Sequence, residues 1–209
     1  MVLAAHLFLI FMLTYLPPRL VTAPPPLALV NVVVGDTVLA LAHINEEGAV
    51  AHVAITQGAP PFTDEVIKAI NQWSFVPGQL DGNAVRSEVS VLMMFRPHAL
   101  GNASLAGPAF GFKAPKIPKG DHPSLPHFIF DPGWPVTQLG NEGVVILELD
   151  IADSGRIDGI RVVRDVPGMT DYAIGAVRQW DFTPAVVDGM PVATTTIVGI
   201  SFVYPVLNR

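Results

Sequence analysis

Alternating apolar and polar residues in the second half of the chain predict a β-hairpin, a helix and a further strand. Residues 144–152 (VVILELDIA) put four aliphatic side chains on one face, as a strand with one buried side requires. After a turn, residues 157–164 (IDGIRVVR) form the returning strand. Residues 172–180 (YAIGAVRQW) have apolar residues at helical spacing. Residues 193–204 (ATTTIVGISFVY) supply a long third strand.

The same pattern occurs earlier in the chain, because the sequence contains a direct repeat with an offset of 107 residues. Residues 36–97 align with residues 143–204 without a gap, and 17 of the 62 positions are identical. The densest block is Q-W-x-F-x-P followed by D-G, which occurs at residues 72–82 and again at residues 179–189. Rare residue types at identical offsets indicate a duplication, so we expect both copies to share one fold.

We therefore expect an α+β protein made of two β-β-α-β modules, each a three-stranded antiparallel sheet with one helix on one face. In copy one, the four elements are expected at residues 37–45, 50–57, 63–73 and 86–95. A single helix covers only one face of such a sheet. The other face therefore needs a separate explanation in each copy.

That second face differs between the copies. In copy one it is apolar and carries Leu39, Leu41, Leu92 and Met94. Copy two has Ile146, Glu148, Asp150, Gly199 and Ser201 on this face. Because large apolar faces are rarely left bare, we expect the face of copy one to be covered by the other module or by residues 27–34. Copy two, with its polar face, is the better candidate for the working domain, and copy one for packing, dimerisation or a structural role.

Proline-rich stretches divide the chain into four parts. Residues 1–24 combine an apolar segment with the start of a short proline-rich spacer, and residues 25–97 form the first module. Residues 98–132 are rich in Pro, Gly and Ala and are expected to be a semi-extended linker. Residues 133–209 form the second module.

The N-terminal segment, residues 1–16, is mostly apolar and has no charged side chain. It is shorter than the roughly 20 residues that a membrane-spanning helix needs, and it lacks the basic start of an export signal. An uncleaved anchor, an atypical export signal and a chain that starts further upstream all remain open, as does a buried helix. We favour membrane contact through residues 1–16.

Composition excludes several classes of function. The chain has 12 Lys and Arg against 18 Asp and Glu, a net charge of -6, which disfavours nucleic acid binding. It has no cysteine, so disulfides, thiolate catalysis and cysteine-based zinc sites are excluded. No catalytic constellation stands out, and His122 and His127 flank prolines without a third metal ligand. His43 and His52 are expected to face each other across the first hairpin. We expect no enzyme activity, cofactor or metal.

The second copy resembles the C-terminal domain of TonB proteins. The resemblance starts at Trp134-Pro135, continues through G-x-V-x-L-x-L-x-I-x-x-x-G at residues 143–155, and includes Q-W-x-F-x-P-A-x-x-D-G-x-P-V at residues 179–192. Copy one keeps most of the second motif but has no equivalent of the leading Trp-Pro pair. The residues of the signature, which we expect to be mostly structural, are Trp134, Pro135, Gly155, Trp180, Phe182, Pro184, Gly189, Trp73, Phe75, Pro77 and Gly82.

This resemblance implies a cell-envelope adaptor with periplasmic domains, anchored in the inner membrane or exported. Its implied partners are outer-membrane transporters, one of whose peptides is held as an added strand, and inner-membrane motor proteins; a homodimer is a further option. In strand addition, a sheet edge offers unpaired backbone groups to an extended peptide. The expected edge is the third strand of copy two, with Thr194, Thr196, Val198, Ile200, Phe202 and Tyr204.

Two departures from the family pattern keep an alternative open. The family's membrane helix commonly has a serine four residues before a histidine, but here Val2 stands four residues before His6. The stretch between residues 16 and 36 is also a short spacer. The alternative is a periplasmic binding or structural module that keeps the fold and has lost energy transduction.

Overall fold

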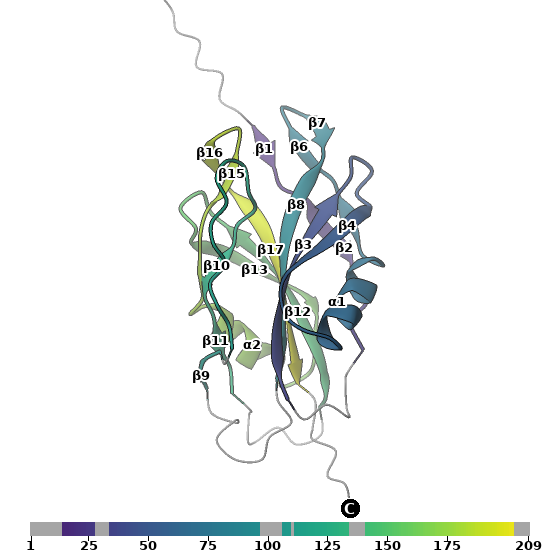
Figure 1. The fold of residues 1–209 in the computed structure, drawn as a ribbon, viewed down its shortest axis with the longest axis vertical. Coiled ribbons are helices and arrows are strands. Elements are labelled where there is room, and N and C mark those ends of the chain that lie inside the picture. Colours follow the sequence, from purple (N-terminus) through teal and green to yellow (C-terminus); the bar gives the residue numbers. More distant parts are fainter. Residues whose placement is uncertain (1–13, 28–33, 97–105, 110, 134–140, 203–209) are drawn as a thin grey trace, which may run out of the picture.

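The structure is a computed structural model, and it describes residues 14–27, 34–96, 106–109, 111–133 and 141–202. It confirms a mixed α+β fold, but the long strands form one six-stranded sheet instead of two separate three-stranded sheets (Figure 1). The sheet order is β13-β12-β17-β8-β3-β4. Its strands are β3 (Asp36–Ile44), β4 (Val50–Gln57), β8 (Ser87–Phe95), β12 (Gly143–Ile151), β13 (Ile157–Arg164) and β17 (Thr194–Phe202).

Each copy follows the expected order up to its helix and then adds short strands that the sequence pattern did not predict. The helices are α1 (Phe62–Ile70) and α2 (Thr170–Val177). Copy one then has β5 (Ser74–Val76), β6 (Gly78–Leu80) and β7 (Asn83–Val85), and copy two has β14 (Asp181–Phe182), β15 (Ala185–Val187) and β16 (Met190–Val192). The simple β-β-α-β order is therefore incomplete.

The Asp-Gly pairs of the repeat form the turns between these short strands. Asp81 and Gly82 have φ angles of 49° and 82°, and Asp188 and Gly189 have φ angles of 50° and 72°. Two successive residues with positive φ are typical of a tight hairpin whose twist matches its strands. The two turns thus connect β6 to β7 and β15 to β16 in the same way.

The two copies meet at β8 and β17, the only parallel pair in the six-stranded sheet. Val91 lies opposite Ile197 and Leu92 opposite Val198, an offset of 106 residues, whereas equivalent residues of the repeat are 107 apart. Because side chains alternate between the two faces of a strand, a shift of one residue turns equivalent side chains to opposite faces. Copy two is therefore flipped relative to copy one, and α1 and α2 cover opposite faces of the shared sheet (Figure 1).

This flip covers the second face of each copy with residues of the other. Leu39, Leu92 and Met94 of copy one are buried in the cluster that also holds α2 residues and Trp180. In the reverse direction, Val144, Ile146 and Ile197 of copy two lie in the cluster under α1. The expectation that the apolar face of copy one is covered is met, and the cover includes the other module. Leu41 is only half-buried.

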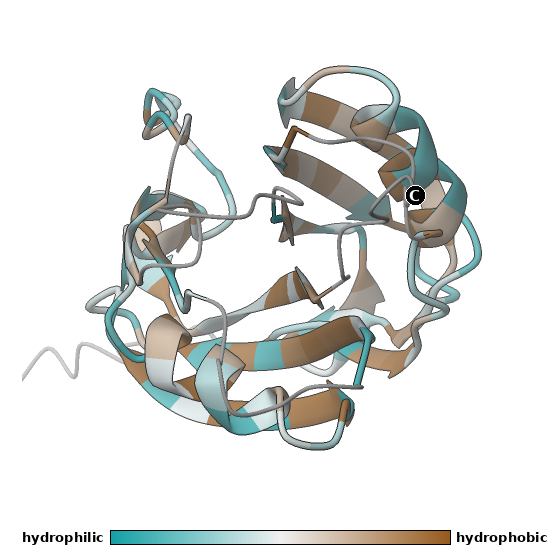
Figure 2. Cartoon of the chain, turned by 90° about the horizontal axis from the view of Figure 1, so that it is seen from below, coloured by the Kyte–Doolittle hydropathy of each residue, from teal (hydrophilic) through white to brown (hydrophobic). Residues whose placement is uncertain are grey.

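The helices follow from their sequence patterns. In α1, Val66, Ala69 and Ile70 are buried, while Asp64 and Lys68 are exposed, so one stripe of the helix faces the sheet. Figure 2 shows the strands as the most hydrophobic part of the molecule and hydrophilic residues on the outer side of the helices. Both helices are shorter than the sequence pattern indicated and end before the Gln-Trp pair.

The proline-rich segments are not free spacers where the structure describes them. Strand β2 (Arg19–Thr22) pairs antiparallel with β5 of copy one, and β10 (Pro126–Phe128) pairs antiparallel with β14 of copy two. Strand β1 (Tyr15–Leu16) pairs with β6, and β11 (Phe130–Asp131) pairs with β9 (Gly107–Pro108). Both segments therefore pack as parts of the fold. Residues 28–33 lie outside the described residues.

Replacing Leu92 with alanine tests the shared sheet. Leu92 belongs to copy one but is fully buried in the cluster of copy two, so we expect a loss of about 2–5 kcal/mol in the free energy of unfolding. Urea unfolding should show one transition, with the same lowered midpoint for fluorescence near Trp73 and near Trp180, read in variants that keep only Trp73 or only Trp180 of the three tryptophans. Val162→Ala on β13, at a 41% exposed side chain, is the control and should change stability by less than about 0.5 kcal/mol. Two separate transitions would contradict a single folding unit.

Candidate partner-binding surfaces

The prediction that the third strand of copy two, β17, is the partner-binding edge is wrong, because β17 is not at an edge of the sheet. The strand pairs with β12 along its whole length, and residues 196–201 pair with β8 on the other side. All nine of its residues are buried, including Thr194, Thr196, Val198, Ile200 and Phe202. Tyr204 lies outside the described residues. β17 is a central strand, because the equivalent strand of copy one occupies the side on which a partner strand would be added.

The edges of the sheet are instead β4 and β13, the second strands of the two copies. They are equivalent in the repeat, and both contain register shifts at equivalent places. They differ in charge: β13 (IDGIRVVR) carries Asp158, Arg161 and Arg164, whereas β4 (VAHVAITQ) carries no acidic residue, lysine, arginine or proline. Charged residues and prolines on an edge strand discourage pairing with another chain. By that criterion β13 is protected and β4 is not.

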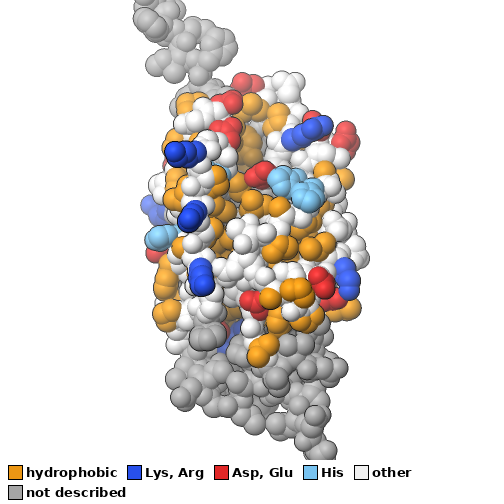
Figure 3. Space-filling view, viewed as in Figure 1, with side chains coloured by type: hydrophobic (Ala, Val, Ile, Leu, Met, Phe, Trp, Pro, Cys, Tyr) orange, Lys and Arg blue, Asp and Glu red, His pale blue; other side chains and the backbone are white. Residues whose placement is uncertain are grey.

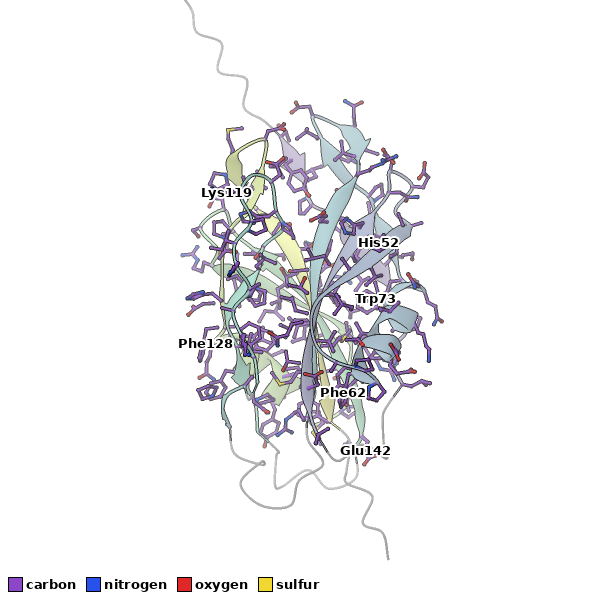
Figure 4. The ribbon with its side chains drawn as sticks, in the orientation of Figure 1. His52, Phe62, Trp73, Lys119, Phe128 and Glu142 are labelled. Carbon is purple, nitrogen blue, oxygen red and sulfur yellow. The ribbon has the colours of Figure 1, made fainter. Side chains whose placement is uncertain are left out.

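The aromatic residues of the repeated signature lie in the core. Trp73, Phe75, Trp180 and Phe182 are each no more than 8% exposed. The indole Nε1 of Trp73, whose side chain is labelled in Figure 4, donates to the carbonyl of Pro24 at 2.9 Å, and that of Trp180 donates to the carbonyl of Phe130, also at 2.9 Å. Each tryptophan therefore fastens the segment that precedes its own module.

Gly155 and the two prolines of the signature lie at a second contact that both copies share. Gly155 has a φ of 84°, and a side chain there would come within 2.3 Å of the carbonyl oxygen of Phe182. Gly48 has the same relation to Phe75 in copy one. Pro77 and Pro184 lie next to these glycines, and Gly82 and Gly189 are in the Asp-Gly turns. Trp134 and Pro135 lie outside the described residues.

The part of the polar face of copy two that holds Glu148 and Asp150 is covered by the N-terminal strap, which we define as residues 14–24. Glu148 in β12 is 0% exposed, although its neighbours along the strand are aliphatic. Its carboxylate accepts hydrogen bonds from the backbone N–H of Leu20 at 2.7 Å and from Arg161 at 2.9 and 3.1 Å, and it pairs with Arg19 at 3.0 Å. Arg19 also pairs with Asp150. This carboxylate therefore joins β13, β12 and the strap.

A scan against protein-family models matches both copies. The model for the Gram-negative bacterial TonB protein C-terminal domain matches residues 33–97 and again residues 136–204. The chain belongs to this TonB C-terminal family. Neither the comparison with curated proteins nor the comparison with solved structures found a match.

Membership of the TonB C-terminal family makes the chain a TonB-like protein of the Gram-negative envelope and agrees with a non-enzymatic role. The family as a whole is associated with outer-membrane transporters. No helix within the described residues is long and apolar enough to cross a membrane. The predicted membrane contact falls on residues 1–16, most of which lie outside the described part.

A cleft of about 920 Å³, lined by both polar and apolar residues, opens between the two copies at the end of the sheet that carries the Asp-Gly turns. His43 and His52 line it and are paired across β3 and β4, as the sequence predicted, with ring centroids 5.4 Å apart. His43 Nδ1 lies 3.1 Å from a carboxylate oxygen of Glu88, and Figure 3 shows histidines beside an acidic side chain on this face. The part of the chain that the structure describes contains no group of three residues suited to hold a metal ion.

Tyr15 from the strap also lines this cleft. Burial raises the pKa of its phenol above 10.0, and a hydrogen bond with Ser87 opposes that shift. A raised pKa means that the folded state favours the neutral phenol, so this contribution to stability is present below pH 10 and is lost as pH rises through the folded pKa. The effect lies well above physiological pH.

Replacing Trp180 with phenylalanine tests the structural reading of the signature. The change removes the donor to the Phe130 carbonyl and keeps most of the aromatic volume, so we expect a loss of about 1–2 kcal/mol in the free energy of unfolding. Trp73→Phe should cost a similar amount, because it removes the equivalent bond to Pro24. Tyr172→Phe, at a 39% exposed side chain, is the control in urea unfolding. Unchanged stability together with lost partner capture would instead make Trp180 a contact residue.

Proposed function

We propose that the chain is a TonB-like adaptor of the cell envelope that binds an extended peptide of an outer-membrane transporter by strand addition at β4. The observation that carries the proposal is the uncharged edge strand β4 in a protein of the TonB C-terminal family. The proposal keeps the mode of binding that the family resemblance implied and moves its location from the third strand of copy two to the second strand of copy one.

Backbone pairing supports β4 as the site. Among the described residues, β4 has a strand partner on one side only, so its outer backbone groups are open to an added strand. The open stretch is bounded at one end by the bridge between Ala49 and Ser74, and at the other by the hydrogen bond from the backbone N–H of Lys113 to Gln57. An eight-residue strand offers enough backbone groups for a short extended peptide.

Copy two supplies an internal comparison. Its equivalent edge, β13, has the same length and equivalent register shifts but carries three charged residues. Arg161, which stands where β4 has Ala54, is held by Glu148. Side-chain charge therefore separates the two edges, and it favours β4.

The proposed setting is the periplasm, with residues 1–16 as an inner-membrane anchor or export segment and motor proteins as further partners for energised transport. A periplasmic binding or structural module without energy transduction is the second candidate. The pairing of β8 with β17 favours it, because each third strand is closed by the other copy. Deletion of the gene separates the two candidates: lost transporter-dependent uptake supports the first, and unchanged uptake supports the second.

Proline substitutions at Val53 and Ala54 test the β4 edge. Neighbouring residues of a strand point their backbone N–H groups to opposite sides, so one of these prolines removes an outward N–H and the other disrupts the ladder with β3. We expect the outward variant to keep its melting temperature within a few degrees and to lose capture of an outer-membrane transporter from envelope extract. The inward variant should be destabilised by about 3 kcal/mol or more.

The control is a neighbouring pair on β13, Val162→Pro and Val163→Pro, at the positions that correspond to Ile55 and Thr56 of β4. Whichever of these keeps its melting temperature should still capture the transporter, because β13 is not the proposed edge. Capture retained by the stable β4 variant would rule out β4 as the binding strand, and capture lost in the stable β13 variant would move the site to copy two.

A further inference from the structure

The N-terminal strap lies on copy two in the manner of a bound peptide. Residues 14–24 belong to the proline-rich stretch before copy one, and β2 pairs with β5 of that copy. Yet the polar contacts of residues 18–20 reach Glu148, Asp150, Arg161 and Thr195, all of copy two. A segment held by side chains that recognise its backbone and one basic side chain has the features of a peptide in a recognition groove.

Leu20 shows this recognition most directly. Its backbone N–H donates to Glu148 at 2.7 Å, and its backbone C=O accepts from Nη2 of Arg161 at 2.7 Å. The same Arg161 nitrogen lies 2.9 Å from Glu148, so the ion pair presents an acceptor and a donor side by side to one residue. The side chain of Leu20 is 3% exposed and packs in the cluster under α1.

The residues before Leu20 add selectivity. The guanidinium of Arg19 reaches both Glu148 and Asp150. Charge-assisted pairs with two carboxylates favour a basic side chain at this position. The hydroxyl of Thr195, a buried residue, donates to the carbonyl of Pro18 at 2.7 Å. Proline has no backbone N–H, so Pro18 requires no donor partner there.

Copy one has no equivalent of this site. The positions that correspond to Glu148, Arg161 and Thr195 are Leu41, Ala54 and Glu88. Neither Leu41 nor Ala54 can hydrogen bond through its side chain. The groove therefore arose in copy two after the duplication, or was lost from copy one.

We propose that the Glu148 face of copy two, together with β5, is a binding site for an extended peptide with arginine followed by leucine, and that residues 18–20 fill it as a built-in ligand. A competing segment of the same chemistry displaces the strap. This segment is the strap of a second copy of the chain, because residues 18–20 are the sequence that the site is seen to hold. This site is distinct from the β4 edge and does not depend on it.

A labelled peptide with the sequence of residues 14–24 tests the proposal, with binding measured by fluorescence anisotropy. Arg19→Ala in the full chain weakens the strap where it touches copy two and leaves the groove intact, so it should bind the peptide at least tenfold more tightly than the wild-type chain. Adding Glu148→Gln should reduce that affinity at least tenfold. Arg156→Ala, which removes an exposed arginine paired with Asp158, is the control and should bind as the wild type does.

A peptide with alanine in place of its arginine probes the site without altering the protein, in case Glu148→Gln fails to fold. It should bind the Arg19→Ala chain at least tenfold more weakly than the unaltered peptide. Absence of peptide binding to the folded Arg19→Ala chain would overturn the proposal. Binding that is equally strong with the altered peptide would overturn it as well.

Sedimentation of the wild-type chain over a range of concentrations identifies the source of the ligand. A dimer that disappears in the Glu148→Gln chain identifies the strap of a second copy. A monomer at all concentrations would overturn exchange between copies, and peptide binding by its Arg19→Ala variant would then leave a partner protein as the source. The stable β4 proline variant should bind the peptide normally, so failure at β4 and failure at the Glu148 site are separate results.

Discussion

The structure depends on the parallel pairing of β8 with β17, which joins the third strands of the two copies. Two copies of a half-covered sheet each have an exposed face, and simple side-by-side pairing in the same orientation would leave both bare faces on one side of the sheet. The register of 106 residues instead of 107 flips one copy, so each helix lies on the side that the other copy leaves open. Apolar residues from both copies then fill two clusters on opposite faces, each containing strand residues from either half.

The duplication, the signature block and the mixed α+β class follow from the sequence, because they depend on local periodicity and on rare residue types. Which strands lie at the edges depends on the pairing between copies, and local periodicity does not report it. Charge does not report it either. Residues 193–204, which include the central strand β17, contain no charged side chain, and residues 157–164 of the edge strand β13 carry three. However, the edge strand β4 is uncharged and the central strand β12 carries Glu148 and Asp150.

The role of the proline-rich stretches was also hidden from the sequence. Their composition is typical of spacers, but the contacts that fix them are backbone pairs with β5 and β14 and the two indole hydrogen bonds. Glu148 was the informative residue, since a carboxylate between aliphatic neighbours in a buried strand needs partners. Those partners include Arg19, 129 positions away, and no periodic pattern connects the two.

The two copies have diverged in complementary directions. Copy two has the more complete family motif. Its Glu148 is nevertheless bound by the strap, so the complete motif does not mean that this face is free to bind a partner. Copy one has the less complete family motif and an apolar second face, and its outer strand β4 is uncharged. Joining the third strands closes one edge in each copy and leaves the second strands outermost. One of these strands carries three charged residues, among them Arg161, which also holds the strap, and the other carries none. A protein with two equal binding edges would have no such asymmetry, and selection against edge-to-edge aggregation alone would place charges on both strands.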